Sequence, residues 1–184
     1  LLDDLISGIK RGDLWLMKEF RDELGQRLYG NVCLEVLLKS GGTCLLLHVN
    51  HGQCTLDDMP EAIEYGMKTL LELHPVTGVG DSGHYLKPEE DRQVGLGFLG
   101  LANQLAALGI TYAELAEAFT RSHRHASNPS LLADQWIARF AEGVERAARL
   151  ARHAGMDRAF CIAPTASCSY QSTDLRGFAC APEI

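Results

Sequence analysis

The sequence predicts an α/β fold, because short apolar stretches typical of buried strands alternate with longer stretches of helical spacing. The run TCLLLHV at Thr43–Val49 is nearly continuous in apolar residues, as a buried parallel strand would be. The chain has 184 residues, 46% of them hydrophobic, so a single domain over 1–184 with one core is expected. Its three predicted strands are too few for a barrel or a large sheet. Either the fold is small or its other strands lie outside this chain.

Two helices and a strand are expected at the start of the chain. Leu1–Lys10 and Leu14–Leu28 both have helical spacing, and Asp13 would cap the second. Asn31–Leu38 is predicted to be a strand, and Lys39–Gly42 to be the turn that follows it.

The central part is expected to hold one long helix between two loops. Asn50–Thr55 is polar, and Leu56–Leu73 has helical spacing. Asp57 and Asp58 suit the positive end of that helix. His74–Pro88, rich in Gly, Pro and His, is predicted to be a long loop.

The remaining predicted elements are helices at 95–108 and 112–121, a helix from Asn128 to about His153, a strand at 159–163 and a Ser/Thr-rich turn at 164–171. Asn128 would cap the long helix, with Pro129 at its first position. Gly155 would end it.

Charge and hydropathy exclude several classes of partner. The net charge is −7 and the pI is near 5.5, so no basic face is expected to hold a nucleic-acid polymer. Single nucleotides remain possible ligands, because backbone amides can hold their phosphates. No apolar run is long enough to suggest a membrane span. Because the first residue is Leu1 and not Met, the chain is expected to be part of a longer polypeptide or one product of a split one.

The six cysteines show no CxxC pair and no zinc-type spacing with histidine, so no metal site is expected. A disulfide-stapled secreted domain is not expected at this length. A reducing, cytoplasmic setting fits better, and the cysteines are then core residues or catalytic thiols. For any single cysteine the core is favoured, since an unmodified Cys behaves as a small hydrophobe.

One glycine motif is expected to be structural. Gly95, Gly97 and Gly100 spell GxGxxG, but a dinucleotide site needs a strand immediately before it. The polar stretch 87–93 is not a buried strand. Close packing of a helix through small residues is the expected explanation.

Two stretches carry chemistry. In NVCLEV, strand alternation would put Asn31, Cys33 and Glu35 on one face, with Cys44 on the neighbouring strand. A buried carboxylate is costly unless it is paired or functional. The alternative is an edge strand whose polar face meets water.

The second stretch is APTASCS at 163–169. Its backbone amides and the hydroxyls of Thr165, Ser167 and Ser169 could bind phosphate oxygens. The alternative is an ordinary capped helix start.

In this order, the segments resemble the catalytic subunit of ribonucleotide reductase. NVCLE at 31–35 looks like the family's N-x-C-x-E motif on the finger loop, and CLLLHVN at 44–50 looks like its C-x-L-x-x-x-N segment. RQVGLGFLGLA at 92–102 looks like R-x-x-G-L-G-x-x-G-L-A, and PTASCS at 164–169 looks like the P-T-A-T-x-S phosphate loop. The resemblance implies part of a ten-stranded α/β barrel with a central finger loop.

The resemblance also implies roles. Cys33 would become a thiyl radical that abstracts the 3′ hydrogen of a ribonucleotide, and Glu35 would be the base on the 3′ hydroxyl. Asn31 would hold the ribose hydroxyls. Cys44 would be one of two thiols that reduce the 2′ carbon, with its partner on sequence before this chain. The product would be a deoxyribonucleotide, a DNA precursor.

Substrate and partners follow from the same resemblance. The phosphates of a ribonucleoside diphosphate, or less expectedly a triphosphate, would lie on the phosphate loop, formed by Pro164, Thr165, Ala166, Ser167, Cys168 and Ser169. The chain itself would bind no cofactor. The radical would come from a metal-containing partner subunit or from adenosylcobalamin. Other partners would be the rest of the catalytic subunit and thioredoxin or glutaredoxin as reductant, in the cytoplasm.

Some features depart from the family pattern. The stretch GFACAPE at 177–183 only approximates the usual G-I-E-P. The short distance from Cys33 to the phosphate loop indicates a compact member, as in a virus or phage, which would act in the host cytoplasm. The remaining cysteines, Cys54, Cys161, Cys168 and Cys180, have no family role and would be packing residues.

Two alternatives stay open. A glycyl-radical enzyme shares the barrel and the finger-loop cysteine, but would lack Glu35 and Cys44. A non-catalytic nucleotide-binding or assembly fragment would keep the phosphate loop and need no radical thiol.

Overall fold

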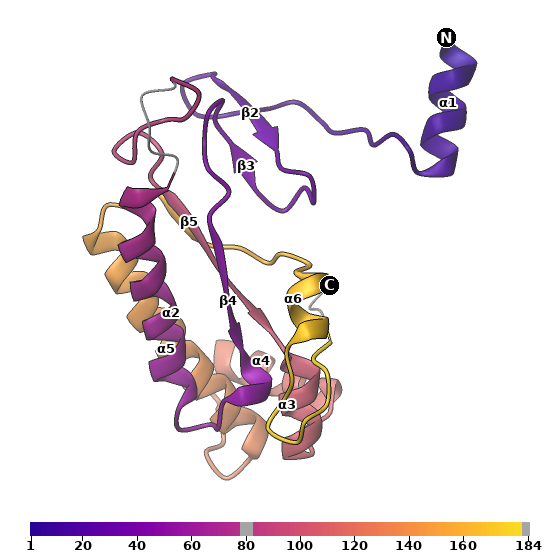
Figure 1. Cartoon of the computed structure of the whole chain (residues 1–184). Helices are drawn as coiled ribbons and strands as arrows, with labels where there is room; N and C mark the ends of the chain where they lie inside the picture. Colours follow the sequence, from indigo (N-terminus) through magenta and orange to yellow (C-terminus); the bar gives the residue numbers. More distant parts are fainter. Residues whose placement is uncertain (78–82, 182–184) are drawn as a thin grey trace.

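The computed structural model describes residues 1–77 and 83–181, which form a mixed α/β structure with two three-stranded sheets and no ten-stranded barrel (Figure 1). The helices are α1 (Leu2–Arg11), α2 (Met59–Leu73), α3 (Leu101–Leu108), α4 (Tyr112–His123), α5 (Leu132–His153) and α6 (Ala166–Gln171), with short 3-10 turns η1 (His51–Gln53) and η2 (His74–Val76). The strands are β1 (Phe20–Arg21), β2 (Arg27–Gly30), β3 (Leu37–Leu38), β4 (Leu46–Asn50), β5 (Gln93–Leu99) and β6 (Arg158–Phe160). None of the described helices is long and apolar enough to cross a bilayer.

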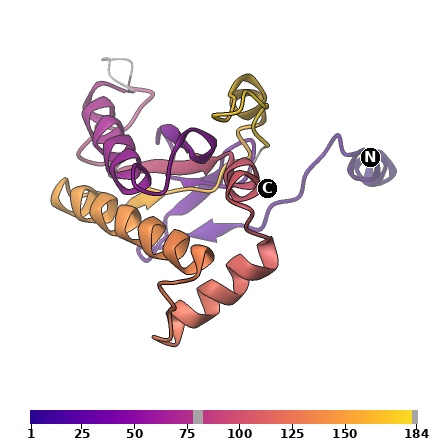
Figure 2. The ribbon, with the colours of Figure 1, turned by 90° about the horizontal axis from the view of Figure 1, so that it is seen from below.

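The main sheet is parallel, with the order β4-β5-β6. Leu46 lies opposite Gly95, His48 lies opposite Gly97, and Leu96 lies opposite Phe160. The prediction of a parallel strand at 43–49 is therefore confirmed, although β4 begins three residues later and is half-buried except at Val49. Helices α2 and α5 lie together on one side of this sheet, as Figures 1 and 2 show.

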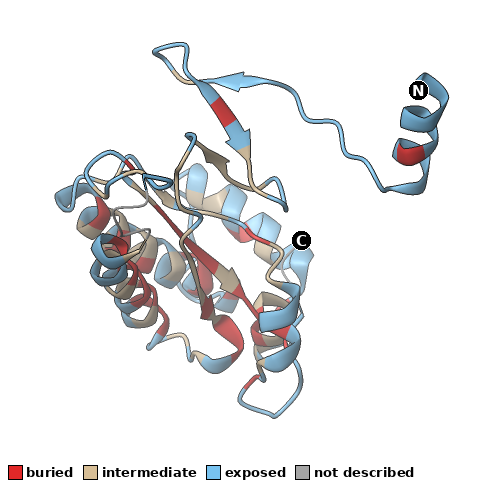
Figure 3. Ribbon diagram, turned by 45° about the horizontal axis from the view of Figure 1, so that its top comes forward, coloured by how far each residue is buried: buried red, intermediate tan, exposed pale blue. Residues whose placement is uncertain are grey.

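The core lies between these two helices and the sheet. Met59, Ile63, Met67 and Leu70 of α2 are fully buried, and their spacing puts them on one face of the helix. Each such side chain contributes about 1.5–3 kcal/mol of burial free energy. Gly143 of α5 permits close contact, because a Cβ there would lie 2.8 Å from Ile63 Cδ1. Figure 3 shows buried residues concentrated in this region, whereas α1 extends away from it and is largely exposed.

The helix predicted at Leu14–Leu28 is wrong, because its second half forms an antiparallel hairpin of β1 and β2. A turn separates the strands: Asp22 Oδ1 accepts hydrogen bonds from the amides of Leu24 and Gln26, and Gly25 has φ +78°. This side-chain cap and the left-handed glycine favour a turn over a continuous helix. Asp13 caps no helix, and Gly12 in a left-handed conformation ends α1.

The strand predicted at Asn31–Leu38 is also wrong over most of its length. Only Leu37–Leu38 is extended, as β3, and residues 31–36 form the loop that joins β2 to β3. Backbone hydrogen bonds from Asn31 N to Val36 O and from Leu34 N to Asn31 O close this loop. Leu34 has φ +64°, a conformation that no strand contains. Cys33 and Cys44 therefore do not lie on neighbouring strands.

The helix predicted at 95–108 is a strand followed by a helix. Residues 93–99 form β5, and Gly100 with φ +75° begins α3. Gly95 and Gly97 face Leu46, His48 and Cys161, and a Cβ at either glycine would lie less than 3.0 Å from these residues. The glycines thus permit close approach within a sheet, not helix packing. In a dinucleotide site the glycines form the phosphate-binding turn after the strand. Here Gly95 and Gly97 lie inside β5, so the GxGxxG pattern does not form such a turn.

The helices at 112–121 and 128–153 are confirmed with shifted ends. Thr111 and Glu114 form a capping box at the start of α4. Helix α5 begins at Leu132, so Asn128 is not its cap; the Asn128 side chain instead accepts a hydrogen bond from the Ser130 amide. Gly155, with φ +74°, follows the end of α5 as expected.

Toward the C-terminus, β6 covers 158–160 in place of 159–163, and α6 replaces most of the turn predicted at 164–171. The segment that follows returns to the end of β4. Asn50 donates to Thr173 O over 3.1 Å and accepts from the Gly52 amide, and Cys180 Sγ lies 3.3 Å from Asn50 Oδ1. Parts of two predictions, residues 78–82 of the long loop and 182–183 of GFACAPE, lie outside the described residues.

Candidate active site

The side chain of Asn31 connects three of the predicted catalytic residues. Its Nδ2 donates to Glu35 Oε1 over 2.6 Å and lies 3.5 Å from Cys44 Sγ. Its Oδ1 accepts from the Val36 amide over 3.2 Å. Asn31 and Glu35 therefore meet because the loop closes on itself, and not through the strand alternation that the sequence suggested.

Cys33 lies in the middle of this loop and is exposed, as is Cys44 just before β4. Burial raises the pKa of the Cys44 thiol, the hydrogen bond from Asn31 lowers it, and the nearby Glu35 and Cys33 raise it further. A raised pKa keeps a thiol protonated near neutral pH. A protonated thiol can supply a hydrogen atom, and is a poor nucleophile.

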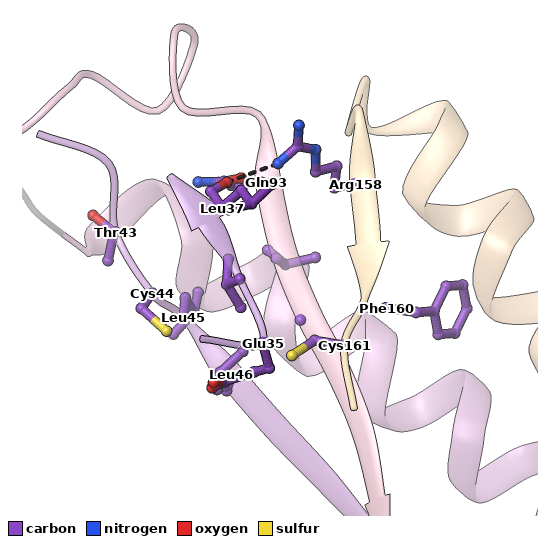
Figure 4. Close-up of a pocket in the computed structure, with 13 residues that line it drawn as sticks. Glu35, Leu37, Thr43, Cys44, Leu45, Leu46, Gln93, Arg158, Phe160 and Cys161 are labelled. Atoms are coloured by element: carbon purple, nitrogen blue, oxygen red, sulfur yellow. Dashed lines mark hydrogen bonds between the residues drawn. The ribbon is translucent and has the colours of Figure 1, made fainter. Parts of the chain in front are cut away.

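Loop 31–36 and the sheet line a partly open cavity of about 220 Å³ (Figure 4). Glu35, Cys44, Gly95 and Cys161 are among its lining residues. Figure 4 shows the Glu35 side chain between those of Cys44 and Cys161. Burial, followed by the charges of Glu35 and Cys44, raises the pKa of Cys161 to about 11. Cys161, expected from the sequence to be a packing residue, therefore belongs to this group of thiols.

Arg158 of β6 connects the main sheet to β3, the strand that follows loop 31–36. Its Nη1 donates to the backbone oxygen of Leu37 over 2.7 Å, which connects β6 to β3 (Figure 4). Arg158 also lines the cavity, at the end where Gln93 begins β5. The cavity therefore has a cationic group at one end and the Glu35 carboxylate within it.

Two buried polar atoms on this side of the sheet have no hydrogen-bond partner among the described residues. They are Glu35 Oε2 and His48 Nε2. Burial lowers the pKa of His48, and the charge of Glu35 partly opposes this effect. An unsatisfied buried polar atom costs about 1–3 kcal/mol and calls for an explanation. The sequence assigns His48 no role, because its place on the same face of β4 as Leu46 points to Glu35 only once β4 and β5 are aligned.

The predicted phosphate loop lies further along the chain and lines no part of this cavity. Thr165 has φ +40° and precedes α6, while Ala166, Ser167 and Cys168 are exposed in its first turn. The Ser169 hydroxyl is buried and donates to Ala166 O over 2.8 Å, so it serves the helix itself. Of the residues predicted to bind phosphate, Pro164 and Thr165 lie just before α6 and Ser167 lies in its first turn.

The structure thus brings together Asn31, Glu35 and Cys44, with Cys33 nearby, and places residues 164–169 apart from them. Among the described residues, no three His, Cys, Asp or Glu side chains are grouped closely enough to hold a metal ion. Neither a protein-family model nor a curated protein matches this chain.

Proposed function

We propose that this chain carries part of the active site of a ribonucleotide reductase, which converts ribonucleotides to 2′-deoxyribonucleotides by thiyl-radical chemistry. The observation that supports this most is the Asn31 side chain, which contacts Glu35 and Cys44 at separations of 4 and 13 residues along the chain. A carboxylate and a thiol joined through one amide side chain are groups that such a reaction needs.

The fold supports the same proposal at a coarser level. Loop 31–36 lines a cavity together with β4, β5 and β6, and α2 packs against the sheet through Leu47, Val49 and Leu96. Parallel strands with helices outside and a thiol-bearing loop inside are what part of a ten-stranded barrel with a finger loop would contain.

The first half of the proposed reaction uses the loop residues. The Cys33 thiyl radical takes the 3′ hydrogen atom of the ribose and becomes a thiol, while Glu35 takes the proton of the 3′ hydroxyl. Asn31 orients the hydroxyls by hydrogen bonding. The radical itself is supplied from outside this chain, by a metal-containing partner subunit or by adenosylcobalamin.

The second half removes oxygen from the 2′ carbon. The 2′ hydroxyl leaves as water, and two thiols supply two electrons and two protons as they become a disulfide. Cys44 is one of these thiols, and the family resemblance puts the other on an earlier strand. Cys33 then returns its hydrogen atom to the 3′ carbon, so Cys33 is regenerated and Cys44 is consumed. Thioredoxin or glutaredoxin would reduce the disulfide.

The substrate is proposed to be a ribonucleoside diphosphate more than a triphosphate. Pro164, Thr165 and Ser167, with the backbone amides at the start of α6, would contact its phosphates. The reaction would take place in the cytoplasm, where thiols stay reduced.

Thiol protection tests the proposal on the chain itself. Alkylation of each cysteine is followed by peptide mass spectrometry with and without a ribonucleoside diphosphate. Cys33 and Cys44 should be protected by the nucleotide, while Cys54, held by a 3.4 Å contact to Asn50 O, serves as the internal control. Binding without protection of Cys33 and Cys44 would favour the non-catalytic nucleotide-binding fragment.

Turnover tests the chemistry, in the protein that includes this chain together with its radical source. Cys33→Ser should abolish deoxynucleotide formation while nucleotide binding survives, because a serine O–H bond is far harder to break homolytically than a thiol S–H bond. Cys44→Ser should still allow 3′ hydrogen abstraction, but stall before reduction. Product formation by Cys33→Ser above background would refute the assignment.

A further inference from the structure

We propose that His48 is a further substrate-contacting residue of this site, and that its imidazole hydrogen-bonds a ribose hydroxyl of the bound nucleotide. This inference rests on the proposed function and adds to it a residue that neither the motifs nor the resemblance assigns.

The position of the ring is set by the register of the sheet. His48 lies opposite Gly97, and a Cβ at residue 97 would lie 2.6 Å from ring atoms Cδ2 and Nε2 of His48. The ring therefore occupies space that a β5 side chain would fill. Leu46, two residues earlier on the same face of β4, lines the cavity that contains Glu35. His48 thus extends the surface of that cavity along the sheet.

The same register places His48 between the two predicted binding regions. Leu46 and Gly95 lie opposite each other beside the cavity, and His48 and Gly97 are the next pair on the same face toward the carboxyl ends of the strands. The Cys161 amide donates to Leu96 O, so the chain after β6 passes this pair just before it reaches Pro164. A nucleotide with its ribose near Glu35 and its phosphates near Pro164 would lie across His48.

The hydrogen-bonding state of the two buried atoms identifies the chemistry of the contact. Glu35 Oε2 can only accept a hydrogen bond while ionised, and His48 Nε2 can donate or accept according to its tautomer. A sugar hydroxyl both donates and accepts, so one hydroxyl, or two adjacent ones, can satisfy both atoms. A phosphate is an anion near pH 7 and would be repelled by the charge of an ionised Glu35.

The surrounding groups favour the neutral imidazole that this contact uses. The charged and titratable groups beside the loop and sheet are Glu35, Cys33, Cys44, Cys161 and Arg158. Glu35 is the one of them that acts on the charge of His48. Burial outweighs Glu35 and lowers the pKa of His48, so the ring is neutral near pH 7. A neutral ring suits an uncharged hydroxyl better than a phosphate.

The test is a set of affinities measured by calorimetry on the full chain, with ADP, 2′-deoxyADP and 3′-deoxyADP as probes. His48→Ala should weaken ADP binding about fivefold to tenfold, as expected for one lost hydrogen bond. It should leave the affinity for the deoxy analogue that lacks the contacted hydroxyl unchanged. His48→Gln, which keeps a hydrogen-bonding amide, should recover part of the loss. His153→Ala, at an exposed position near the end of α5, is the matched control and should change nothing.

The outcomes separate the two proposals. If the wild-type chain binds none of the three nucleotides, the proposed function fails and this inference fails with it. If the wild type prefers ADP but His48→Ala keeps that preference, only the role of His48 is overturned. A loss that is equal for all three nucleotides would show a structural role and would also overturn the inference. Should His48→Ala prove unfolded by circular dichroism, the same comparison is made with His48→Leu, which fills similar space without a hydrogen-bonding group.

Discussion

Asn31 and Glu35 face each other across the turn of loop 31–36, joined by a 2.6 Å hydrogen bond from the Asn31 amide to the Glu35 carboxylate. The same Asn31 side chain accepts a hydrogen bond from the Val36 amide. One residue therefore both stabilises the loop conformation and orients the Glu35 carboxylate. The conformation of the loop and the position of its acid group are therefore coupled.

This coupling predicts different effects for two substitutions of Asn31. Asn31→Ala removes both contacts and should speed hydrogen exchange of the Val36 amide, because that amide loses its side-chain acceptor. Asn31→Asp keeps an acceptor for Val36 but places a second carboxylate beside Glu35, so it should retain slow exchange while the affinity for nucleotide falls. Equal protection of Val36 in wild type and Asn31→Ala, measured by nuclear magnetic resonance, would contradict the prediction.

The raised pKa of Cys161 predicts slow alkylation at mildly alkaline pH. With a pKa of about 11 in place of the ordinary 9.0, its thiolate fraction at pH 8 is lower by roughly a hundredfold. Its reaction rate with iodoacetamide should therefore keep rising up to about pH 11. Glu35→Gln removes one of the charges that raise this pKa and should make Cys161 react faster at pH 8. A rate that levels off near pH 9 would show that burial and Glu35 have no such effect.

The buried His51 predicts a loss of stability in acid. Its ring is 1% exposed, stacks on Phe98 at a centroid distance of 5.0 Å, and burial lowers its pKa from 6.5 to about 4. The unfolded chain takes up a proton near pH 6.5, whereas the folded chain does not do so until about pH 4. This stability is present above pH 6.5 and is lost as pH falls toward 4, by about 2–3 kcal/mol.

His51→Phe is the variant that isolates this effect, since it keeps an aromatic ring and removes the titration. Urea unfolding at pH 7 and pH 4.5 should show a smaller pH-dependent loss for His51→Phe than for wild type. The difference between the two losses is the quantity attributed to His51. If both proteins lose the same free energy, another group carries the acid sensitivity.

The close contact of α2 with α5 predicts that Gly143 tolerates no larger residue. A Cβ at this position would lie 2.8 Å from Ile63 Cδ1 and 2.9 Å from Pro60 Cα, and the second atom is backbone. Gly143→Ala should therefore lower the unfolding free energy by about 1–3 kcal/mol, despite the higher helix propensity of Ala. Glu145→Ala, on the exposed side of α5, is the control for urea denaturation and should have little effect. A stabilised Gly143→Ala would mean that the helices separate at little cost.

Long periodic stretches of this sequence predict their structure well, and short ones do not. Helices α2 and α5 were found because their apolar spacing persists over several turns. Residues 31–36 alternate polar and apolar side chains as a strand does, yet hydrogen bonds within the loop decide their conformation. Residues 95–100 combine glycine with apolar residues, a composition that suits a helix contact or a crowded strand equally. The partner strands that settle this choice lie more than 40 residues away in sequence.

In the candidate site, too, residues close together in the chain could be predicted, and those that depend on distant strands could not. Asn31, Cys33, Glu35 and Cys44 could be named from their residue types and spacing, because they are close together in the chain. Cys161 and His48 could not, since their relation to Glu35 depends on how β4, β5 and β6 align. Ser169 was expected to bind phosphate, but its hydroxyl is used within α6, a contact that appears only once the helix has formed.

The hydrogen bond from Asn50 to Thr173 O joins residues far apart in the sequence, and this distance affects when the contact can form during folding. Asn50 is joined to Thr173 across 123 residues, whereas Asn31 meets Cys44 across only 13. Closing the longer loop costs about 2 kcal/mol more chain entropy. The contacts of Asn31 with Glu35 and Cys44 can therefore form early, whereas those of Asn50 need the segment after α6. On a ribosome, the end of β4 would wait for its final partner until almost the whole of this sequence had been synthesised.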